Sequence, residues 1–336
     1  MRRSVVRISL AVAAIVAMAG CGRSSPAGSG ANDRTLTIAS PSSAGFSHLP
    51  LYMTADRLNQ QGWKIKFVTF QGNDLAFQAL IDGDAQISHG ATGNAMLAVQ
   101  KGGDIRLVAD RNRPEWVLVA NGKINRCEDI RNSSRAAISA TGDSILPQMK
   151  PYFDSCGAKP SILVISDSSN RIAALQSGQL DLAPVELSDW VKLSLDQPGK
   201  FHALSFLGDN LPKLSTSGIY ANGKWLRDHH AVAVQFFTEM LETVRSIYQD
   251  PSQLDAPASK FLKDAKPEIV RDQIKEYTAK QMWPVNGGLT DDVIKFSIDW
   301  NVGRGYLKSG LTTAQVFDST VLADVLKDIG TEPGKS

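Results

Sequence analysis

From residue 35 onward, short apolar runs alternate with segments whose apolar positions have helical spacing. This pattern predicts strands at residues 35–39, 63–70 and 85–88, and helices at residues 49–59 and 74–82. Gly83, directly after the second helix, is a typical residue for ending a helix. A strand–helix–strand–helix–strand order predicts a parallel sheet flanked by helices.

The same order returns about 95 residues later. It predicts strands at residues 136–140, 161–166 and 180–183, and helices at residues 144–156 and 170–177. The residues repeat as well as the order, because the motif ALxxG at residues 79–83 stands again at residues 174–178. We therefore predict a second α/β lobe that is built like the first.

A second repeated sequence, ANGK, stands at residues 120–123 and 221–224, one copy before the second lobe and one after it. An apolar run precedes each copy, and we interpret the two runs as strands that cross between the lobes. The hinge is then expected near residues 114–120 and 215–221.

These boundaries give an α/β fold of two lobes joined by two crossover strands. Lobe I is predicted to contain residues 35–117 plus 219–330, and lobe II residues 118–218. From residue 225 to residue 336 the pattern is helical, for example at residues 232–248, and this part is expected to pack on lobe I.

The first 34 residues have a different character. Arg2, Arg3 and Arg7 precede an apolar run at residues 8–19, which is the layout of an export signal. The Cys that follows Gly20 is typical of bacterial lipoproteins, so we expect residues 1–20 to be a signal peptide, Cys21 to be lipidated and residues 21–34 to form a flexible tether. The alternative is an ordinary secretory signal in which Cys21 is incidental. Both interpretations predict an extracytoplasmic protein, and the first adds a lipid anchor to the cell membrane.

Composition and charge exclude several classes. Of the 336 residues, 43% are apolar and 21% charged, as in ordinary globular proteins. The formal net charge of +2 becomes −1 without the three leader arginines, which gives no electrostatic basis for binding nucleic acid. No stretch after the leader is apolar enough over a sufficient length for a transmembrane helix. A monomer is expected.

Two cysteines remain in the body of the chain, Cys127 and Cys156. In an oxidising compartment they are expected to form a disulfide; the alternative is two unpaired buried thiols. Neither has the spacing of a Cys-x-x-Cys or a metal-ligand motif, so no metal or cofactor is expected.

Five segments together resemble one family: residues 62–66 (GWKIK), 77–83 (FQALxxG), 90–92 (GAT), 171–181 (RxxALQSGQLD) and 310–313 (GxxT). It is the family of solute-binding proteins of ABC importers for aliphatic sulfonates, nitrate, taurine and thiamine-type pyrimidines. The resemblance implies the type II periplasmic-binding-protein fold, with two Rossmann-like lobes, two crossover strands and a ligand cleft between the lobes. It also implies a membrane permease as partner. Residues 41–46 depart from the aromatic-rich helix start that is common in the family.

The ligand site of such sheets lies beyond the carboxyl ends of the strands, where helix N-termini also offer free N–H groups. Loops at these positions supply the candidate ligand-binding residues Ser42, Ser43, Gly72, Asn73, Thr92, Gly93 and Asn94 in the first lobe, and Thr141, Gly142, Asp143, Ser144 and Glu186 in the second. Helix capping or turn formation is the alternative role for several of them, including Asn73, Asp143, Gly72 and Gly142. Residues 90–94 are the strongest group, because two glycines let the backbone approach a ligand closely.

The charges in these loops bear on the type of ligand. Carboxylates stand near the proposed cleft, whereas the nearest basic residues, Arg111 and Arg113, lie at the hinge. Glu186 is therefore a candidate acceptor for an amine or a ring N–H, as on a taurine-like or pyrimidine-like solute; the alternative is a solvated loop carboxylate. Trp116 and Trp190 could stack on a ring, or serve only in packing.

The sequence thus predicts a receptor that captures a small polar solute and closes around it. One alternative is an enzyme, since pyrimidine-synthesis enzymes share this fold. The five histidines (His48, His89, His202, His229 and His230) are scattered, however, and no Gly-x-Ser-x-Gly motif is present, so no catalytic residue is assigned. The other alternative is an envelope lipoprotein that uses a degenerate cleft only as a scaffold.

Overall fold

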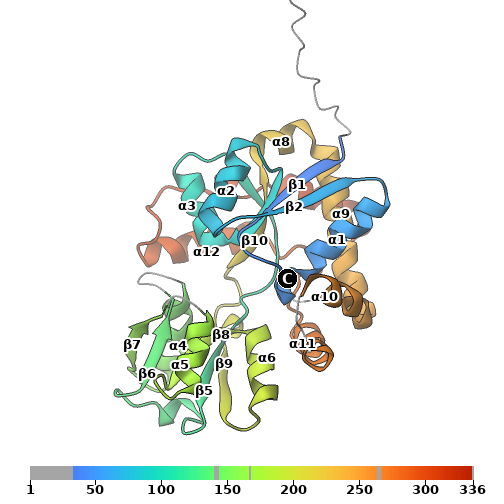
Figure 1. Cartoon of the computed structure of the whole chain (residues 1–336). Helices are drawn as coiled ribbons and strands as arrows, with labels where there is room; N and C mark the ends of the chain where they lie inside the picture. Colours follow the sequence, from blue (N-terminus) through green and yellow to red (C-terminus); the bar gives the residue numbers. More distant parts are fainter. Residues whose placement is uncertain (1–32, 140–143, 166–167, 263–265, 335–336) are drawn as a thin grey trace, which may run out of the picture. The chain divides into compact units, whose positions relative to one another are not determined.

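The computed structural model describes residues 33–139, 144–165, 168–262 and 266–334. These described residues belong to one compact unit, and its backbone is organised around two five-stranded sheets. Figure 1 shows the sheets in separate halves of this unit, each flanked by helices. The two-lobed α/β prediction is confirmed.

The sheet of the first lobe has the strand order β2-β1-β3-β10-β4. Its strands are β1 (Thr35–Ser40), β2 (Lys64–Thr69), β3 (Ile87–Ala91), β4 (Ile105–Asp110) and β10 (Ser217–Asn222), and its helices include α1 (Leu49–Gln60), α2 (Asn73–Asp82) and α3 (Thr92–Gln100). β1 is parallel to β2 and β3, whereas β10 is antiparallel to β3 and β4. Leu36, Ile38 and Ile87 are fully buried, as expected for strands covered on both faces.

The sheet of the second lobe has the order β7-β6-β8-β5-β9. Its strands are β5 (Trp116–Asn121), β6 (Arg135–Ile138), β7 (Ser161–Val164), β8 (Leu182–Glu186) and β9 (Phe201–Phe206), and its helices are α4 (Ile145–Ser155), α5 (Ser168–Gln176), α6 (Leu187–Asp196) and α7 (Leu207–Asn210). Three strands again run parallel, and the fourth, β5, is again antiparallel to its neighbours. The two sheets therefore correspond strand by strand.

The repeated ALxxG motif forms the same turn in both lobes. Gly83 and Gly178 have φ angles of +85° and +74°, which favour glycine, and each N–H donates to the carbonyl three residues earlier. The chain then enters β3 and β8. The repeat in the sequence is therefore a repeat of local structure.

The predicted crossover strands each belong to one sheet. β5 pairs only with strands of the second lobe, and β10 only with strands of the first. The chain passes between the sheets just before these strands, in residues 111–115 and 211–216. The start of the first passage lies beside the end of the second, since the N–H of Arg111 donates to the carbonyl of Ser217, the first residue of β10, at 2.9 Å.

The C-terminal helices differ in part from the prediction. Helices α8 (Gly223–Asp228), α9 (His230–Gln249), α12 (Asp291–Gly303), α13 (Thr313–Val316) and α14 (Ser319–Ile329) contribute to the core of the first lobe, as expected. Helix α11 (Pro267–Ala279) packs against α6 of the second lobe instead, and Gln273 donates to the Ser188 carbonyl at 3.1 Å. Its apolar side joins a buried cluster that includes residues of both lobes, among them Phe46, Val117 and Trp283. Helix α11 follows first-lobe helices in the chain, but burial of its apolar side decides that it packs on the second lobe.

No helix in the described part of the chain combines the length and the apolar character that spanning a bilayer requires. The predicted signal peptide, the tether up to residue 32 and Cys21 lie outside the described residues.

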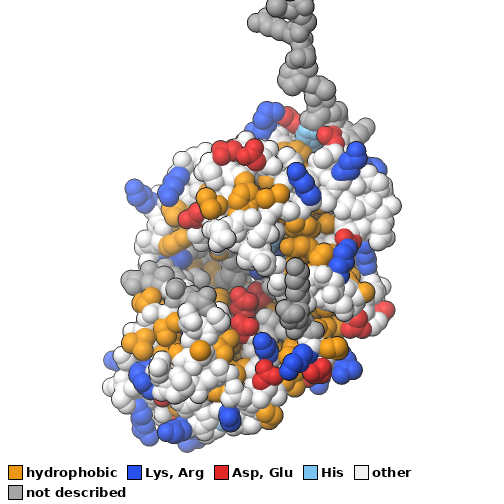
Figure 2. Space-filling model, in the orientation of Figure 1, with side chains coloured by type: hydrophobic (Ala, Val, Ile, Leu, Met, Phe, Trp, Pro, Cys, Tyr) orange, Lys and Arg blue, Asp and Glu red, His pale blue; other side chains and the backbone are white. Residues whose placement is uncertain are grey.

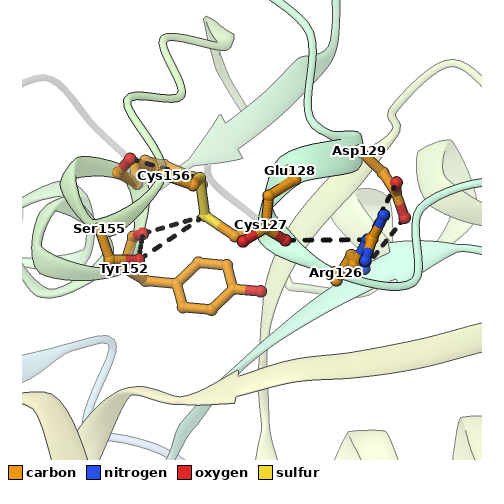
Figure 3. Close-up of a disulfide and its surroundings, with 8 residues drawn as sticks. Arg126, Cys127, Glu128, Asp129, Tyr152, Ser155 and Cys156 are labelled. Atoms are coloured by element: carbon orange, nitrogen blue, oxygen red, sulfur yellow. Dashed lines mark hydrogen bonds and ion pairs between the residues drawn. A yellow bond between two sulfur atoms is a disulfide. The ribbon is translucent and has the colours of Figure 1, made fainter.

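A disulfide joins Cys127 to Cys156, as predicted (Figure 3). It links the short helix η2 (Cys127–Asp129), which lies between β5 and β6, to the residue that ends α4. Helix α4 begins at the loop that follows β6, so the bond fastens the helix end that is remote from this loop. Removing the bond is therefore expected to affect stability more than the loop.

We predict that the double variant Cys127→Ala/Cys156→Ala loses about 3–4 kcal/mol of unfolding free energy, because the bond closes a loop of 29 residues in the unfolded chain. Urea unfolding of the oxidised protein and the variant measures the difference. Treatment of the wild type with a reductant should reproduce the loss and leave the variant unaffected. Equal unfolding midpoints for all samples would contradict the bond.

Candidate functional site

A cavity of about 540 Å³ lies between the carboxyl edges of the two sheets. It is lined by residues that follow β1, β3 and β4 in the first lobe, by residues at the ends of β6 and β8 in the second, and by the starts of β5 and β10. Figure 2 shows the corresponding hollow between the halves, with acidic side chains on its wall. Strand ends converge here as expected for open α/β sheets.

Six of the candidate residues line this cleft: Ser42, Asn73, Gly93, Asn94, Ser144 and Glu186. Three others do not. Ser43 is exposed beside the cleft, Gly72 forms a turn at φ +100°, and Thr92 lies buried behind the wall, where its hydroxyl bonds Ser215 and Tyr220 at 3.0 Å each. The candidates Thr141, Gly142 and Asp143 lie outside the described residues.

Asn73 belongs to the wall of the first lobe and does not cap α2. The residue at the N-cap is Gly72, and the Asn73 side-chain oxygen instead accepts from the Ala91 N–H at 2.9 Å. Gly90, at φ +156°, permits this contact, because a Cβ atom there would lie 2.3 Å from that oxygen. These residues hold the start of α3 against the loop before α2. Nearby, Asn94 donates to Asp74 at 3.2 Å.

The first-lobe rim includes a group that the sequence analysis missed: Trp300, Asn301, Arg304 and Tyr306. The Arg304 guanidinium lies over both aromatic rings, 4.9 Å from the Trp300 centroid and 4.3 Å from the Tyr306 centroid. Its Nε and Nη2 donate to the Asn301 side-chain oxygen at 3.0 and 2.7 Å. A Cβ atom at Gly93 would come 3.2 Å from the Tyr306 ring, so glycine allows the start of α3 to pack here.

Arg111 forms the floor of the cleft, and its donors are engaged. Nη1 donates to His89 Nδ1 at 2.9 Å, Nε donates to Asn112 at 2.8 Å, and Nη2 lies 3.8 Å from a carboxylate oxygen of Glu115. Because a guanidinium only donates, His89 Nδ1 accepts, and its Nε2–H is left to donate to Ser40 at 3.1 Å. Arg111 is therefore held in place from three sides.

His48 lines the cleft next to this floor, 4.8 Å from the ring of His89. Burial lowers the pKa of both imidazoles well below the ordinary value, and the positive charge of Arg111 adds to the shift. Both rings are therefore neutral near pH 7. His48 Nδ1 accepts from the Gly45 N–H at 3.1 Å, so its proton is on Nε2.

The wall of the second lobe is built on the pairing of β5 with β8. Trp116 and Glu186 are cross-strand partners in this pair, so their side chains stand beside each other on one face. Buried Arg171 donates to the carbonyls of Pro184 and Ile165, and its guanidinium lies 5.6 Å from the Trp116 ring centroid. Trp116 is thus a fixed ring that also lines the cleft. Trp190 lies in a different hollow, between β9 and α6.

Two carboxylates of this wall have different surroundings. Glu115 is buried and accepts from Tyr277 Oη at 2.7 Å and from Asn112 at 3.3 Å. Glu186 lines the cleft, and its carboxylate has no hydrogen bond or ion pair among the described residues. Partial burial raises the pKa of Glu186 to about 8, and the nearby charges of Glu115 and Asp189 contribute to the rise.

The sequence profile described as NMT1/THI5 like matches residues 46–254, more than half of the chain. The chain belongs to the NMT1/THI5-like family. The family resemblance expected from the sequence motifs is confirmed, and the match covers the sheet of the second lobe and, in the first lobe, the ends of β3 and β4 and the start of β10 at the cleft. No curated protein matches the chain.

Solved structures share the fold of this chain. The ligand-binding component of an ABC-type import system from Staphylococcus aureus, with zinc bound, has a TM-score of 0.69 at 15% identity, over 87% of this chain and 98% of that one. The periplasmic aliphatic sulphonate-binding protein SsuA from Escherichia coli has a TM-score of 0.68 at 16% identity, and the alignment covers 85% of this chain and 93% of that one. The periplasmic nitrate-binding protein NrtA from Synechocystis PCC 6803 has a TM-score of 0.66 at 10% identity, and the alignment covers 89% of this chain and 90% of that one.

At these identities the likenesses show the fold, so this NMT1/THI5-like chain has the fold of periplasmic binding proteins. The zinc of the first neighbour is not matched by an obvious site. Within residues 33–334, apart from the undescribed gaps, no group of three or more His, Cys, Asp or Glu side chains is arranged to hold a metal ion.

We predict that replacing Glu186 with Gln stabilises the empty protein more at pH 8 than at pH 5. Between the ordinary carboxyl pKa and about 8, the folded protein holds a proton that the unfolded chain has lost, so this group makes stability fall as pH rises through that window. The stability of Glu186→Gln relative to wild type should therefore increase by about 2–4 kcal/mol from pH 5 to pH 8.

Urea unfolding at both pH values tests this expectation. Asp196→Asn is the matched control, because Asp196 is an exposed carboxylate at the end of α6, away from the cleft. The control should keep a constant difference from wild type. A Glu186→Gln difference that stays equally constant would refute the raised pKa.

Proposed function

We propose that this protein is the solute-binding component of an ABC importer. It captures a small polar organic solute of the sulfonate or taurine class in the cleft between its lobes and delivers it to a membrane permease. The observation that carries the proposal is the cavity itself: both lobes line it, and its volume of about 540 Å³ is in the range of small-molecule sites. The family and the named solved structures support a binding protein over an enzyme.

The first-lobe side of the cleft suits an acidic group. Gly93 and Asn94 lie in the first turn of α3, where backbone N–H groups have no partner within the helix. The helix dipole and the nearby guanidinium of Arg304 favour negative charge at this position. A sulfonate would find N–H donors and a planar cation together here.

A heterocyclic solute such as a thiamine-type pyrimidine is the second candidate. The rings of Trp116 and Trp300 both line the cleft, one on each lobe, and aromatic walls favour a planar ligand. Nitrogen-rich rings also carry N–H groups for which Glu186 is an acceptor.

Closure of the lobes around the solute is expected to bend the two passages between the sheets, residues 111–115 and 211–216. Each passage is fastened near one of its ends. Arg111 is fastened to β3 through His89, and Ser215 in the second passage donates to Asp110 at 2.5 Å while its N–H donates to Ser297 at 3.0 Å. Bending is thus confined to a few residues beside the cleft.

We predict that a solute of the correct class stabilises the protein by about 4 kcal/mol when present at one thousand times its Kd. Thermal melting with taurine, other alkanesulfonates, nitrate and aminopyrimidines identifies the class, and native mass spectrometry of the purified protein detects a carried-over solute. Asn94→Ala in the cleft should weaken binding about 3- to 10-fold through the loss of a hydrogen bond. The matched control Asn125→Ala, at an exposed site of the second lobe, should bind normally. If no compound shifts the melting temperature and no solute is carried, the scaffold alternative replaces the receptor.

The membrane anchor is a separate proposal: Cys21 is proposed to be lipidated and residues 1–20 to be removed. We predict that Cys21→Ser moves the protein from the membrane fraction to the soluble extracytoplasmic fraction, since a polar tether without acyl chains has no affinity for the bilayer. Cell fractionation with immunoblotting measures the shift, and Ser24→Ala is a control within the tether. Full membrane retention of the Cys21 variant would exclude this anchor.

A further inference from the structure

We propose that the solute carries a positively charged nitrogen, and that Glu186, with Trp116 beside it, binds this group. The inference rests on the proposed receptor function and specifies the ligand more closely. The names of the solved sulfonate- and nitrate-binding neighbours refer to anionic ligands, so these neighbours do not suggest a cationic group on the solute. It comes from the second-lobe wall of the cleft.

The first observation is the carboxylate without a partner. Glu186 ends β8 at the cleft edge, and among the described residues neither a hydrogen bond nor an ion pair reaches its side chain. It does not serve α6 either, because it stands at the N-cap of that helix without a side-chain cap bond. A partly buried carboxylate without a structural role is costly, which points to a bound partner.

Within the part of the chain that the structure describes, no Lys or Arg side chain pairs with Glu186. Arg111, the cation on the cleft floor, directs Nη1 and Nε to His89 and Asn112, and its nearest carboxylate is Glu115 at 3.8 Å. Arg171 lies under Trp116 and donates to main-chain carbonyls. The negative charge of Glu115 is offset by Arg111 and by the Tyr277 hydroxyl, and that of Glu186 has no comparable partner in the described structure.

The second observation is the aromatic ring beside the carboxylate. Trp116 and Glu186 are opposite each other in the β5–β8 ladder, so a group that contacts one side chain is within reach of the other. An ammonium or amidinium group at this point gains both a charge-assisted hydrogen bond and a cation–π contact. A hydroxyl group can donate to the carboxylate, but it brings no opposite charge and gains no cation–π contact. An anion gains neither interaction.

Charge balance points the same way. Glu115 and Asp189 raise the pKa of Glu186, whereas Arg111 and Arg171 lower it, and burial is the largest influence. Near neutral pH the empty site therefore tends to hold a proton, and a cationic nitrogen replaces that proton when it binds. Binding of the cation then releases a proton and strengthens as pH rises toward 8.

The test uses two pairs of probes that differ only at one group. Taurine is compared with 2-hydroxyethanesulfonate, and 4-amino-5-aminomethyl-2-methylpyrimidine with its 5-hydroxymethyl counterpart. At least one of the two pairs is expected to bind. For that pair, isothermal titration calorimetry at pH 8 should give the amine an affinity about 10- to 100-fold higher than that of the alcohol. In Glu186→Gln the two members should agree within about threefold.

Two further variants complete the experiment. Asp196→Asn removes an exposed carboxylate of the same lobe and should retain the full amine preference. Glu186→Asp keeps the charge and should retain a preference for the amine, which guards against a Glu186→Gln variant that fails to fold. In wild type, affinity for the amine should rise at most about tenfold per pH unit between pH 6 and pH 8, and Glu186→Gln should lose this slope.

The outcomes separate this inference from the receptor function. If the alcohol binds as tightly as the amine, if Glu186→Gln keeps the amine preference, or if the protein binds only solutes without a cationic nitrogen, the inference is overturned and the receptor function stands. If neither these probes nor the wider panel of solutes binds to the wild type, the receptor function itself fails.

Discussion

The geometry of the cleft depends on residues 111–115, which lead from β4 to β5. They carry a buried charge pair, Arg111 with Glu115, between the two sheets. Arg111 is bonded to β3 through His89, and Glu115 is bonded to α11 through Tyr277. Removal of one member of such a buried pair leaves an uncompensated charge, which costs several kcal/mol. The pair therefore links the end of the first-lobe sheet to the start of the second-lobe sheet. Trp116, the ring on the cleft wall, is the next residue along the chain.

Helix α11 connects this passage to the second lobe, because Tyr277 of α11 bonds Glu115 and α11 packs against α6. Phe46, Tyr277 and Trp283 form an aromatic cluster next to the passage, with centroid distances of 4.7 Å between Phe46 and Tyr277 and 5.3 Å between Tyr277 and Trp283. The cluster lies in a core that contains residues of both lobes. A change in the angle between the lobes must therefore keep this core packed, so motion by sliding of α11 over α6 costs less than its separation from α6.

The sequence was informative where structure depends on near neighbours in the chain. The ALxxG repeat predicted two equivalent turns, because the left-handed glycine and the preceding helix are only a few residues apart. It was not informative where structure depends on distant partners. The role of Asn73 is decided by the Ala91 N–H, and that of Arg304 by packing against Gly93. An aromatic and an arginine at helical spacing, such as Trp300 and Arg304, are typical of ordinary packing, so the local pattern gave no reason to place them at the cleft.

The two carboxylates of the second-lobe wall have different surroundings, and as a result the two sides of the cleft favour groups of opposite charge. Glu115 is satisfied inside the protein, and Glu186, one strand away, is left facing the cavity. On the opposite lobe, the first turn of α3 and Arg304 favour negative charge. A solute with a cationic nitrogen at one end and an acidic group at the other would therefore contact both lobes at once. Since neither half of the site alone offers both partners, such a solute binds best when the lobes are close together, and its charge pattern itself favours the closed state.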